Sequence, residues 1–183
     1  VLGPSSVRNL NYGSAVSVCM TERSESRVWD ILETCSVGML TTHGSQGLRA
    51  RPLDARPDRE TGLIQFVTDV RGLKDDEIEA DSRVCFTVID TKDNAYLSIT
   101  GRAAVMRDNI AAAKIWKKTD DVWWPDGPRD HNVRVLTIVP ITAELWDGPA
   151  SRLVAAYEFA KARLTGVKPD LGENRKVTVP IRG

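Results

Sequence analysis

The sequence contains few of the residues that build metal centres and disulfide frameworks. Only two of its 183 residues are histidines, His43 and His131, and they lack the spacing of a zinc motif. The three cysteines form no C-x-x-C pair, and their odd number argues against a disulfide framework and favours a reducing compartment. We therefore expect no protein-bound metal and a cytoplasmic location.

The chain also lacks an excess of charge of either sign. Its 25 lysines and arginines balance its 25 aspartates and glutamates, so the formal net charge is zero. This balance removes the general attraction that draws basic proteins to nucleic acids and anionic membranes, and no apolar run is long enough to span a bilayer. We expect neither kind of partner. Self-association is allowed, because copies without net charge repel each other little.

Motifs of nucleophilic catalysis and of nucleotide binding are missing as well. The sequence has no G-x-S-x-G, no P-loop and no dinucleotide fingerprint, so no catalytic residue is assigned from it. Residues 1–23 are rich in small polar side chains and do not have the form of a signal peptide. We interpret them as a disordered leader or a remnant of cloning, and we expect one folded domain over residues 24–183.

What the sequence does contain is a series of short apolar segments with brief connections. Strands are predicted over residues 37–42, 48–54, 63–68, 83–90, 95–107, 133–139 and 141–147, with a further strand in the tail NRKVTVPIR. Helices are predicted over residues 24–34, 73–80, 109–118 and 151–166, with Ser24 and Asp108 as N-caps and Gly166 at the last C-terminus. Strands follow strands without crossover helices, which excludes a doubly wound sheet. The predicted fold is mainly β, an antiparallel barrel or coiled sheet with peripheral helices.

Three basic residues stand out against this pattern. Arg49 and Arg51 share one face of a strand that also contains Pro52. Proline cannot donate to a sheet ladder, so this strand lies at an edge, is bulged, or faces something other than a strand. Lys74 lies in the first turn of a predicted helix, where free N–H groups favour anions. Solvated basic side chains are the plain interpretation; the alternative is that Arg51 and Lys74 hold an anionic cofactor.

Tryptophans form the other notable group. The polar loop VWWPDGP contains Trp123 and Trp124, whose rings either clamp a planar ligand or seal the end of the barrel. Trp146 lies near the end of a predicted strand, where packing in the core or in an interface is expected.

Seven segments, taken in order, resemble the pyridoxamine 5′-phosphate oxidase-like FMN-binding split barrels, and in particular their general stress protein branch. They are VGMLTT, RARPLD, LIQFVTD with LKDDEI, RVCFTVID, YLSITGRAAVMRD, IWKKTDDVWWPDGP and AELWDG, followed by LTGVKPDLGEN. The resemblance covers residues 28–177; each segment alone is weak, but their common order is fairly specific. It implies a six-stranded split barrel that forms a homodimer, with FMN in a cleft between the subunits.

The resemblance also implies which residues bind the cofactor. Arg51, Pro52 and Leu53 match a strand that lines the edge of the flavin. Val67 and Thr68 match a pair on the next strand that touches the flavin and its ribityl chain. This assignment agrees with the chemistry of flavins, because a positive or N–H-rich edge stabilises the anionic reduced form.

Two further residues complete the implied site. Lys74 matches the lysine that binds the phosphate, and Trp146 matches a tryptophan that approaches the cofactor from the partner subunit. The chain departs from the true oxidases here, since it has Gly72-Leu73-Lys74 where they have Ser-Arg-Lys. One phosphate cation is therefore missing, and Arg71 is the candidate to replace it.

The substrate motif of the true oxidases is also altered. After the tryptophan, Val154 and Ala156 stand where the oxidases have a histidine and an arginine for the pyridoxal substrate, which argues against oxidase activity on pyridoxamine 5′-phosphate. The resemblance still implies an FMN-dependent oxidoreductase acting on a small molecule, with a stress-related role. The alternatives are a flavin-binding stress or sensor protein without turnover, and a relative that binds a deazaflavin or haem, the last disfavoured by the two histidines.

Overall fold

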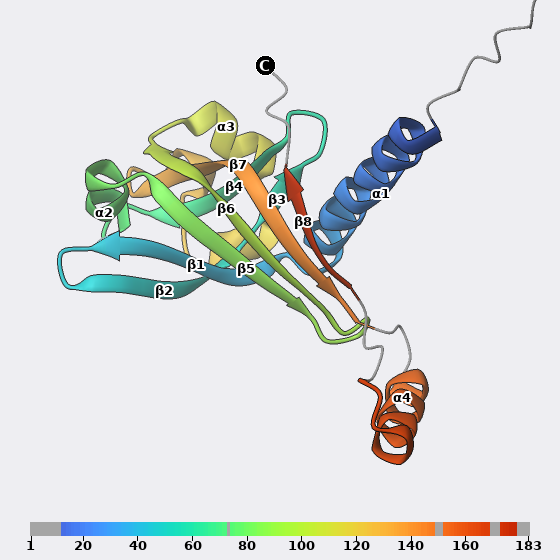
Figure 1. Ribbon diagram of the computed structural model, residues 1–183. Coiled ribbons are helices and arrows are strands. Elements are labelled where there is room, and N and C mark those ends of the chain that lie inside the picture. The colour runs from blue at the N-terminus through green and yellow to red at the C-terminus, as the bar shows by residue number, and fades with distance from the viewer. Residues whose placement is uncertain (1–11, 73, 149–151, 169–172, 179–183) are drawn as a thin grey trace, which may run out of the picture.

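The computed structural model describes residues 12–72, 74–148, 152–168 and 173–178, and these form one curled antiparallel sheet with helices around it (Figure 1). The helices are α1 (Tyr12–Thr34), α2 (Lys74–Ala80), α3 (Asn109–Ile115) and α4 (Arg152–Thr165), with two 3-10 turns, η1 (Lys118–Val122) and η2 (Gly127–Arg129). The strands are β1 (Val37–Gly44), β2 (Gly47–Asp54), β3 (Arg56–Asp58), β4 (Leu63–Asp69), β5 (Arg83–Asp90), β6 (Ala95–Met106), β7 (Val133–Asp147) and β8 (Glu173–Thr178).

The strand order of the sheet is β2-β1-β5-β6-β7-β4-β3, and β8 pairs with β7 beside this path. Each of these neighbouring pairs is antiparallel, as the short connections predicted. The mainly β fold class is therefore confirmed. The described sheet has eight strands rather than the six of the expected barrel, because the short strands β3 and β8 add to it.

The core lies inside the curl of the sheet. Alternate residues of β4 and β5 are buried, which is the period of two expected for strands with one face inward. Phe66 and Phe86 are fully buried at its centre, with ring centroids 5.1 Å apart in an edge-to-face arrangement. This contact joins β4 and β5, which are not neighbours in the strand order, through the core.

One long strand, β7, replaces two predicted strands. The sequence suggested a break at Pro140, but β7 runs unbroken from Val133 to Asp147. The register between β6 and β7 shifts at Gly101, which lies opposite Pro140. A Cβ atom at Gly101 would stand 2.5 Å from the carbonyl oxygen of Val139, so only glycine lets the two backbones approach there. The irregularity takes up the proline without ending the strand.

The first helix begins earlier than the sequence suggested. α1 starts at Tyr12 rather than near Ser24, and so includes part of the segment expected to be a disordered leader. Ser24 is buried inside the helix instead of capping it. Residues 14–34 contain no proline or glycine, so a helix that packs at its C-terminal half extends toward its N-terminus at little cost. Residues 1–11 lie outside the described residues.

The other helix ends follow the expected chemistry. The Asp108 carboxylate accepts hydrogen bonds from the backbone N–H groups of Ile110 and Ala111, which confirms it as the N-cap of α3. Gly166 follows α4 with a φ of 71°, the left-handed conformation expected of a C′ glycine. None of the helices within the described residues is long and apolar enough to cross a membrane.

Candidate functional site

A cavity of about 550 Å³ lies where the two margins of the curled sheet approach each other. β2 stands at one end of the strand order and β4 next to the other end, and both line the cavity. The lining residues are Arg51, Pro52, Leu53, Asp54, Arg56, Val67, Thr68, Asp69, Arg71, Lys74, Thr119, Asp120, Trp123 and Trp124. The structure thus brings together six of the seven residues predicted to bind a cofactor, all except Trp146.

The wall formed by β2 is an open sheet margin. Pro52 pairs with Met39 of β1 on one side, and none of the strands in the described part of the chain pairs with the other side of β2. This position confirms the expectation that a strand containing Pro52 lies at an edge. A proline is tolerated there, because its missing N–H group would otherwise have to donate to a strand on the open side. The margin is therefore available to a ligand.

Arg51 projects from this wall with one nitrogen engaged. Its Nη2 donates to the Glu77 carboxylate at 2.6 Å and to the Thr42 hydroxyl at 3.0 Å. Its Nη1 is buried and has no hydrogen-bond partner among the described residues. A buried donor without a partner is costly, so this nitrogen indicates a place for an acceptor that the chain itself does not supply.

Lys74 is the second cation at the cavity, and it is 7% exposed. Its Nζ donates to the backbone carbonyl of Asp69 at 2.6 Å and lies 3.8 Å from the Asp75 carboxylate. Burial lowers the pKa of the Lys74 amine below its ordinary value of 10.5, and the nearby Arg51 charge lowers it further against the opposing effect of the carboxylates. An anion beside this amine would relieve that strain on its charged form.

Gly72 leaves the space that the Lys74 amine occupies. A Cβ atom at this position would lie 2.8 Å from the Lys74 Nζ. A side chain at position 72 would therefore displace the ammonium group, which lies at the flexible end of Lys74, from its present position.

Asp69, the last residue of β4, contacts two other residues of the cavity wall, Arg71 and Trp124. Its carboxylate accepts from the Arg71 guanidinium and, at 3.1 Å, from the Trp124 indole N–H. Hydrogen bonds from Arg71, together with that indole, hold the pKa of Asp69 well below its usual range in spite of partial burial. Arg71 also lines the cavity, and its charge is shared with Asp69.

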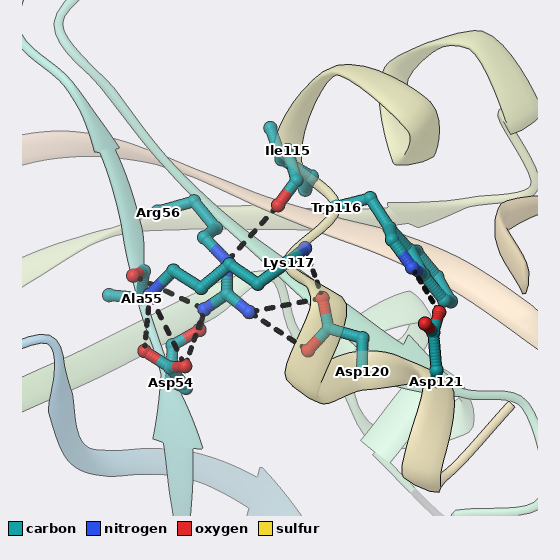
Figure 2. A network of polar contacts seen from close by, with 8 residues as sticks. All are labelled: Asp54, Ala55, Arg56, Ile115, Trp116, Lys117, Asp120 and Asp121. Atoms are coloured by element: carbon teal, nitrogen blue, oxygen red, sulfur yellow. Dashed lines mark hydrogen bonds and ion pairs between the residues drawn. The ribbon is translucent and has the colours of Figure 1, made fainter.

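A buried ion pair between Arg56 of β3 and Asp120 of η1 holds another part of the cavity wall. Figure 2 shows the Arg56 guanidinium directed at the Asp120 carboxylate, with Nη2 within 3.0 and 3.2 Å of the two oxygens. Arg56 also donates from Nε to the backbone carbonyl of Ile115 and from Nη1 to that of Asp54. Arg56 is 9% exposed and Asp120 8%, so this contact is shielded from water.

This network fixes the loop that contains the two tryptophans. The Asp120 carboxylate also accepts from the backbone N–H of Lys117, which sets the start of η1 (Figure 2). Trp124 is buried, with its ring centroid 6.0 Å from that of Trp116, whereas Trp123 is 73% exposed. Trp124 is thus part of the packing, and Trp123 leaves an aromatic face at the mouth of the cavity.

Trp146 lies far from this cavity within its own chain. It is on β7, eleven residues beyond Val135, and Val135 pairs with Val67 of the cavity wall. At the rise of a β-strand this is a separation of roughly 35 Å. Trp146 reaches such a cavity only if a second copy of the chain supplies it.

A larger, open hollow of about 810 Å³ lies between the β1–β2 hairpin and α2. Its arginine, Arg49, is paired with Glu77 at 3.2 Å, so it offers a ligand less unused charge than the smaller cavity. Within the described residues there is also no group of three histidine, cysteine, aspartate or glutamate side chains placed to hold a metal ion.

Several residues that shape the cavity carry no signal in the sequence. Arg56 and Asp120 are 64 positions apart and stand in segments that read as polar loops. Glu77 belongs to an acidic run that is favourable at a helix start for general reasons.

Comparison with known proteins places these features in a wider group. The family model described as "Pyridoxamine 5′-phosphate oxidase like" matches residues 7–170. A structure from Jannaschia sp. CCS1, named as a general stress protein 26, is 28% identical, covers 87% of this chain and 99% of its own, and superposes with a TM-score of 0.69. No curated protein matches the chain significantly.

Two more distant structures have the same fold. The general stress FMN/FAD binding protein of Xanthomonas citri is 21% identical, with 71% of this chain and 92% of that one covered and a TM-score of 0.65. A protein named F420 reductase is 21% identical, with 62% and 93% covered and a TM-score of 0.50. At this identity the likeness describes the fold.

Proposed function

Because the chain belongs to the pyridoxamine 5′-phosphate oxidase-like family, we propose that it binds FMN in the cavity between β2 and β4 and serves as a flavin-dependent oxidoreductase. The observation that supports this most directly is the pair of cations at one cavity. Lys74 is a buried amine, and Arg51 has a buried nitrogen without a partner. Both arrangements favour a ligand with anionic groups.

The residues divide the ligand between them. Lys74 would hold the phosphate, and the margin of β2 at Arg51 and Pro52 would face the edge of the flavin ring. Val67 and Thr68 on β4 would contact the ring and the ribityl chain. These are the roles that the family resemblance implies, and the cavity gives each of the five residues a place in its wall.

Bound FMN would supply the chemistry, the transfer of two electrons to or from a small molecule. The protein would contribute position and charge. Arg51 and Lys74 would favour negative charge on the ligand, and the Arg56–Asp120 pair would keep Trp123 and Trp124 at the cavity wall. The proposal assigns no acid or base to the chain itself.

The proposal includes a homodimer with FMN between the subunits. Four exposed apolar side chains form a row across the outside of the sheet, which we call the outer row: Val37, Ile89, Tyr96 and Trp146. Ile89 pairs with Tyr96, and Tyr96 pairs with Trp146. Val37 lies two residues before Met39 and Ile89 two residues after Thr87, the antiparallel partner of Met39, so the register brings Val37 beside Ile89. A contiguous apolar row on a sheet face is typical of an interface.

The dimer also explains how Trp146 would approach the cofactor. Trp146 is 37% exposed and cannot reach the cavity of its own chain. Figure 1 shows α4 beyond the end of β7 that carries Trp146, and the α4 residues Phe159 and Leu164 are exposed as well.

We further propose the cytoplasm as the location, where Cys35 and Cys85 would stay free thiols.

The test of the proposal is a visible absorption spectrum of the purified protein before and after addition of FMN and removal of the excess. Absorption typical of oxidised flavin after this treatment supports the proposal. A flat spectrum in both states would mean that the fold is present without its cofactor, and the proposed function would be lost. The same titration with a deazaflavin such as F420 identifies a relative that prefers that ligand.

Substitution tests the placement of the phosphate. Lys74→Ala removes a charged donor from the cavity and should weaken FMN binding about tenfold or more, the effect of one charge-assisted hydrogen bond. Arg49→Ala is the matched control, since Arg49 lines the other hollow. Equal and negligible effects of both substitutions on the Kd for FMN would show that the phosphate lies elsewhere.

The second candidate is a flavin-binding stress or sensor protein without turnover. Val154 and Ala156 stand in place of the substrate residues of the true oxidases, which favours a loss of that activity. Reduction of the bound flavin by NADH or NADPH, followed anaerobically by the loss of its visible absorption, separates the two. Flavin that binds tightly but is not reduced favours the sensor.

A further inference from the structure

Glu77 is a buried acid that contacts Arg51 and lines the larger hollow. It belongs to α2 and is 8% exposed, yet it does not line the cavity between β2 and β4. Its carboxylate accepts from three side chains of the β1–β2 hairpin. The Thr42 hydroxyl and the Arg51 Nη2 both lie 2.6 Å from Oε2, and the Arg49 Nη1 lies 3.2 Å from Oε1.

These contacts keep Glu77 ionised. Burial alone would raise the pKa of the Glu77 carboxyl, but the hydrogen bonds from Thr42 and Arg51 and the two arginine charges outweigh it and lower that pKa. A charged carboxylate held by such short contacts is a strong and directional acceptor. The Arg51 guanidinium is therefore fixed through one nitrogen.

The same helix supplies Lys74, three residues before Glu77. Through Glu77, α2 binds β1 and β2, and through the Lys74 amine it binds the end of β4 at Asp69. Glu77 is thus the contact that sets the Arg51 charge relative to the Lys74 charge. The two cations are close enough for Arg51 to lower the pKa of Lys74, so their separation matters to any ligand that engages both.

We propose that Glu77 is a positioning residue for the flavin site: it holds Arg51 by Nη2 at the cavity wall and leaves Nη1 for an acceptor on the ligand. This inference rests on the proposed function, because the acceptor is assigned to the flavin. Glu77 does not line the cavity, so it would position the ligand through Arg51 rather than by contact. The negative charge of Glu77 disfavours binding of an anionic ligand, whereas its hold on the Arg51 guanidinium favours such binding.

These two effects predict opposite changes in FMN affinity when the charge of Glu77 is removed. Glu77→Gln keeps the size of the side chain and removes one negative charge behind the site. If Glu77 acted on FMN only through its charge, the variant would bind FMN more tightly and its flavin would be reduced more easily. If Glu77 positions Arg51, the variant binds FMN several-fold more weakly and the midpoint potential of the bound flavin falls.

The proposal is tested by FMN titration and by flavin potentiometry of the full chain. We expect Glu77→Gln to weaken FMN binding in the wild-type background and to have little further effect when Arg51 is already methionine. Arg49→Met is the matched control, because it removes another partner of the same carboxylate outside the cavity, and it should leave both readouts unchanged. Additive losses for Glu77 and Arg51 would overturn the positioning role.

Other outcomes separate the inference from the function on which it rests. Wild-type protein that binds no FMN refutes both. Wild-type protein that binds FMN, together with a Glu77→Gln variant that binds equally or more tightly, refutes only the role of Glu77. If Glu77→Gln does not fold, Thr42→Val replaces it, since this change removes one of the two groups that grip the Arg51 Nη2 and should weaken FMN binding in the same Arg51-dependent way.

Discussion

The lysine at the cavity makes the stability of the cofactor-free protein depend on pH. Because burial lowers the pKa of Lys74 from 10.5, the unfolded chain binds more protons than the folded chain between the lowered value and 10.5. The free energy of unfolding should therefore rise with pH through that window, as the buried amine loses its charge. Well below the lowered pKa both states are protonated, so the cost of burying the charged amine is present in full and Lys74 adds no pH dependence there.

The expectation for Lys74 is checked by urea denaturation of cofactor-free protein at several pH values up to about 10. Lys74→Met removes the titrating group, so the variant should lack the part of the rise that belongs to it. Binding of FMN should weaken over the same window, because the amine that holds the phosphate loses its proton. Identical pH profiles for wild type and Lys74→Met would refute the assignment of a strained, buried ammonium.

At the scale of single residues, the sequence was a good guide to chemistry and a poor one to pairing. Arg51, Pro52 and Lys74 were singled out for their charge and backbone properties, and the structure places all three on one cavity. The partners of Arg51 were not foreseen. A hydrogen bond between Glu77 and Arg51 depends on how α2 lies against the β1–β2 hairpin, and local sequence does not contain that arrangement.

At the scale of elements, the Arg56–Asp120 pair connects β3 to the tryptophan loop. Arg56→Met leaves the Asp120 carboxylate buried without its main partner, and breaking a buried pair in this way costs about 3–5 kcal/mol. We expect a loss of that size in the free energy of unfolding, measured by urea denaturation. Limited proteolysis should then cut within residues 117–130 at a lower protease concentration.

A second substitution separates the charge from the packing at this point. Asp120→Asn keeps an acceptor for Arg56, whose Nη1 is also paired with the Asp54 carboxylate at 2.8 Å, so neither side is left as an unpaired buried charge and the cost should be smaller than for Arg56→Met. Arg83, exposed and paired with Asp81, is the surface control: Arg83→Met should change stability by less than about 1 kcal/mol. If Arg56→Met and Arg83→Met cost the same, the buried pair does not hold the loop.

The errors in the predicted elements share a physical origin. Pro140 reads as the end of a strand, and the sequence does not show that Gly101, 39 positions earlier, lies opposite and absorbs it. The start of α1 was placed at Ser24 because serine is a common cap, whereas tertiary packing of Val28 and Ile31 stabilises a longer helix. Caps and turns with purely local causes, at Asp108 and Gly166, were predicted correctly.

At the scale of the whole molecule, the outer row should decide the oligomeric state. Ile89 is 59% exposed in the single chain, and Ile89→Lys places a charge in the middle of the row. We expect this variant to sediment as a monomer and to lose FMN affinity, although Ile89 is not part of the cavity wall. The reason is that the monomer lacks the Trp146 of a second copy.

Leu48 is the matched control for the outer row. It is 76% exposed on β2 and stands outside the row, so Leu48→Lys adds the same charge without disturbing the proposed interface. This variant should remain a dimer in analytical ultracentrifugation and keep its FMN affinity. A wild-type protein that sediments as a monomer with FMN bound would show that the site is complete in one chain.

The cavity wall combines residues from Arg51 to Trp124, supplied by both margins of the curled sheet, so it exists only in the folded chain. A ligand that binds there therefore stabilises the folded state through mass action. Free FMN at a hundred times its Kd would add about 2.7 kcal/mol to the free energy of unfolding. The lifetime of this protein against heat and proteases would then follow the supply of flavin in the cell.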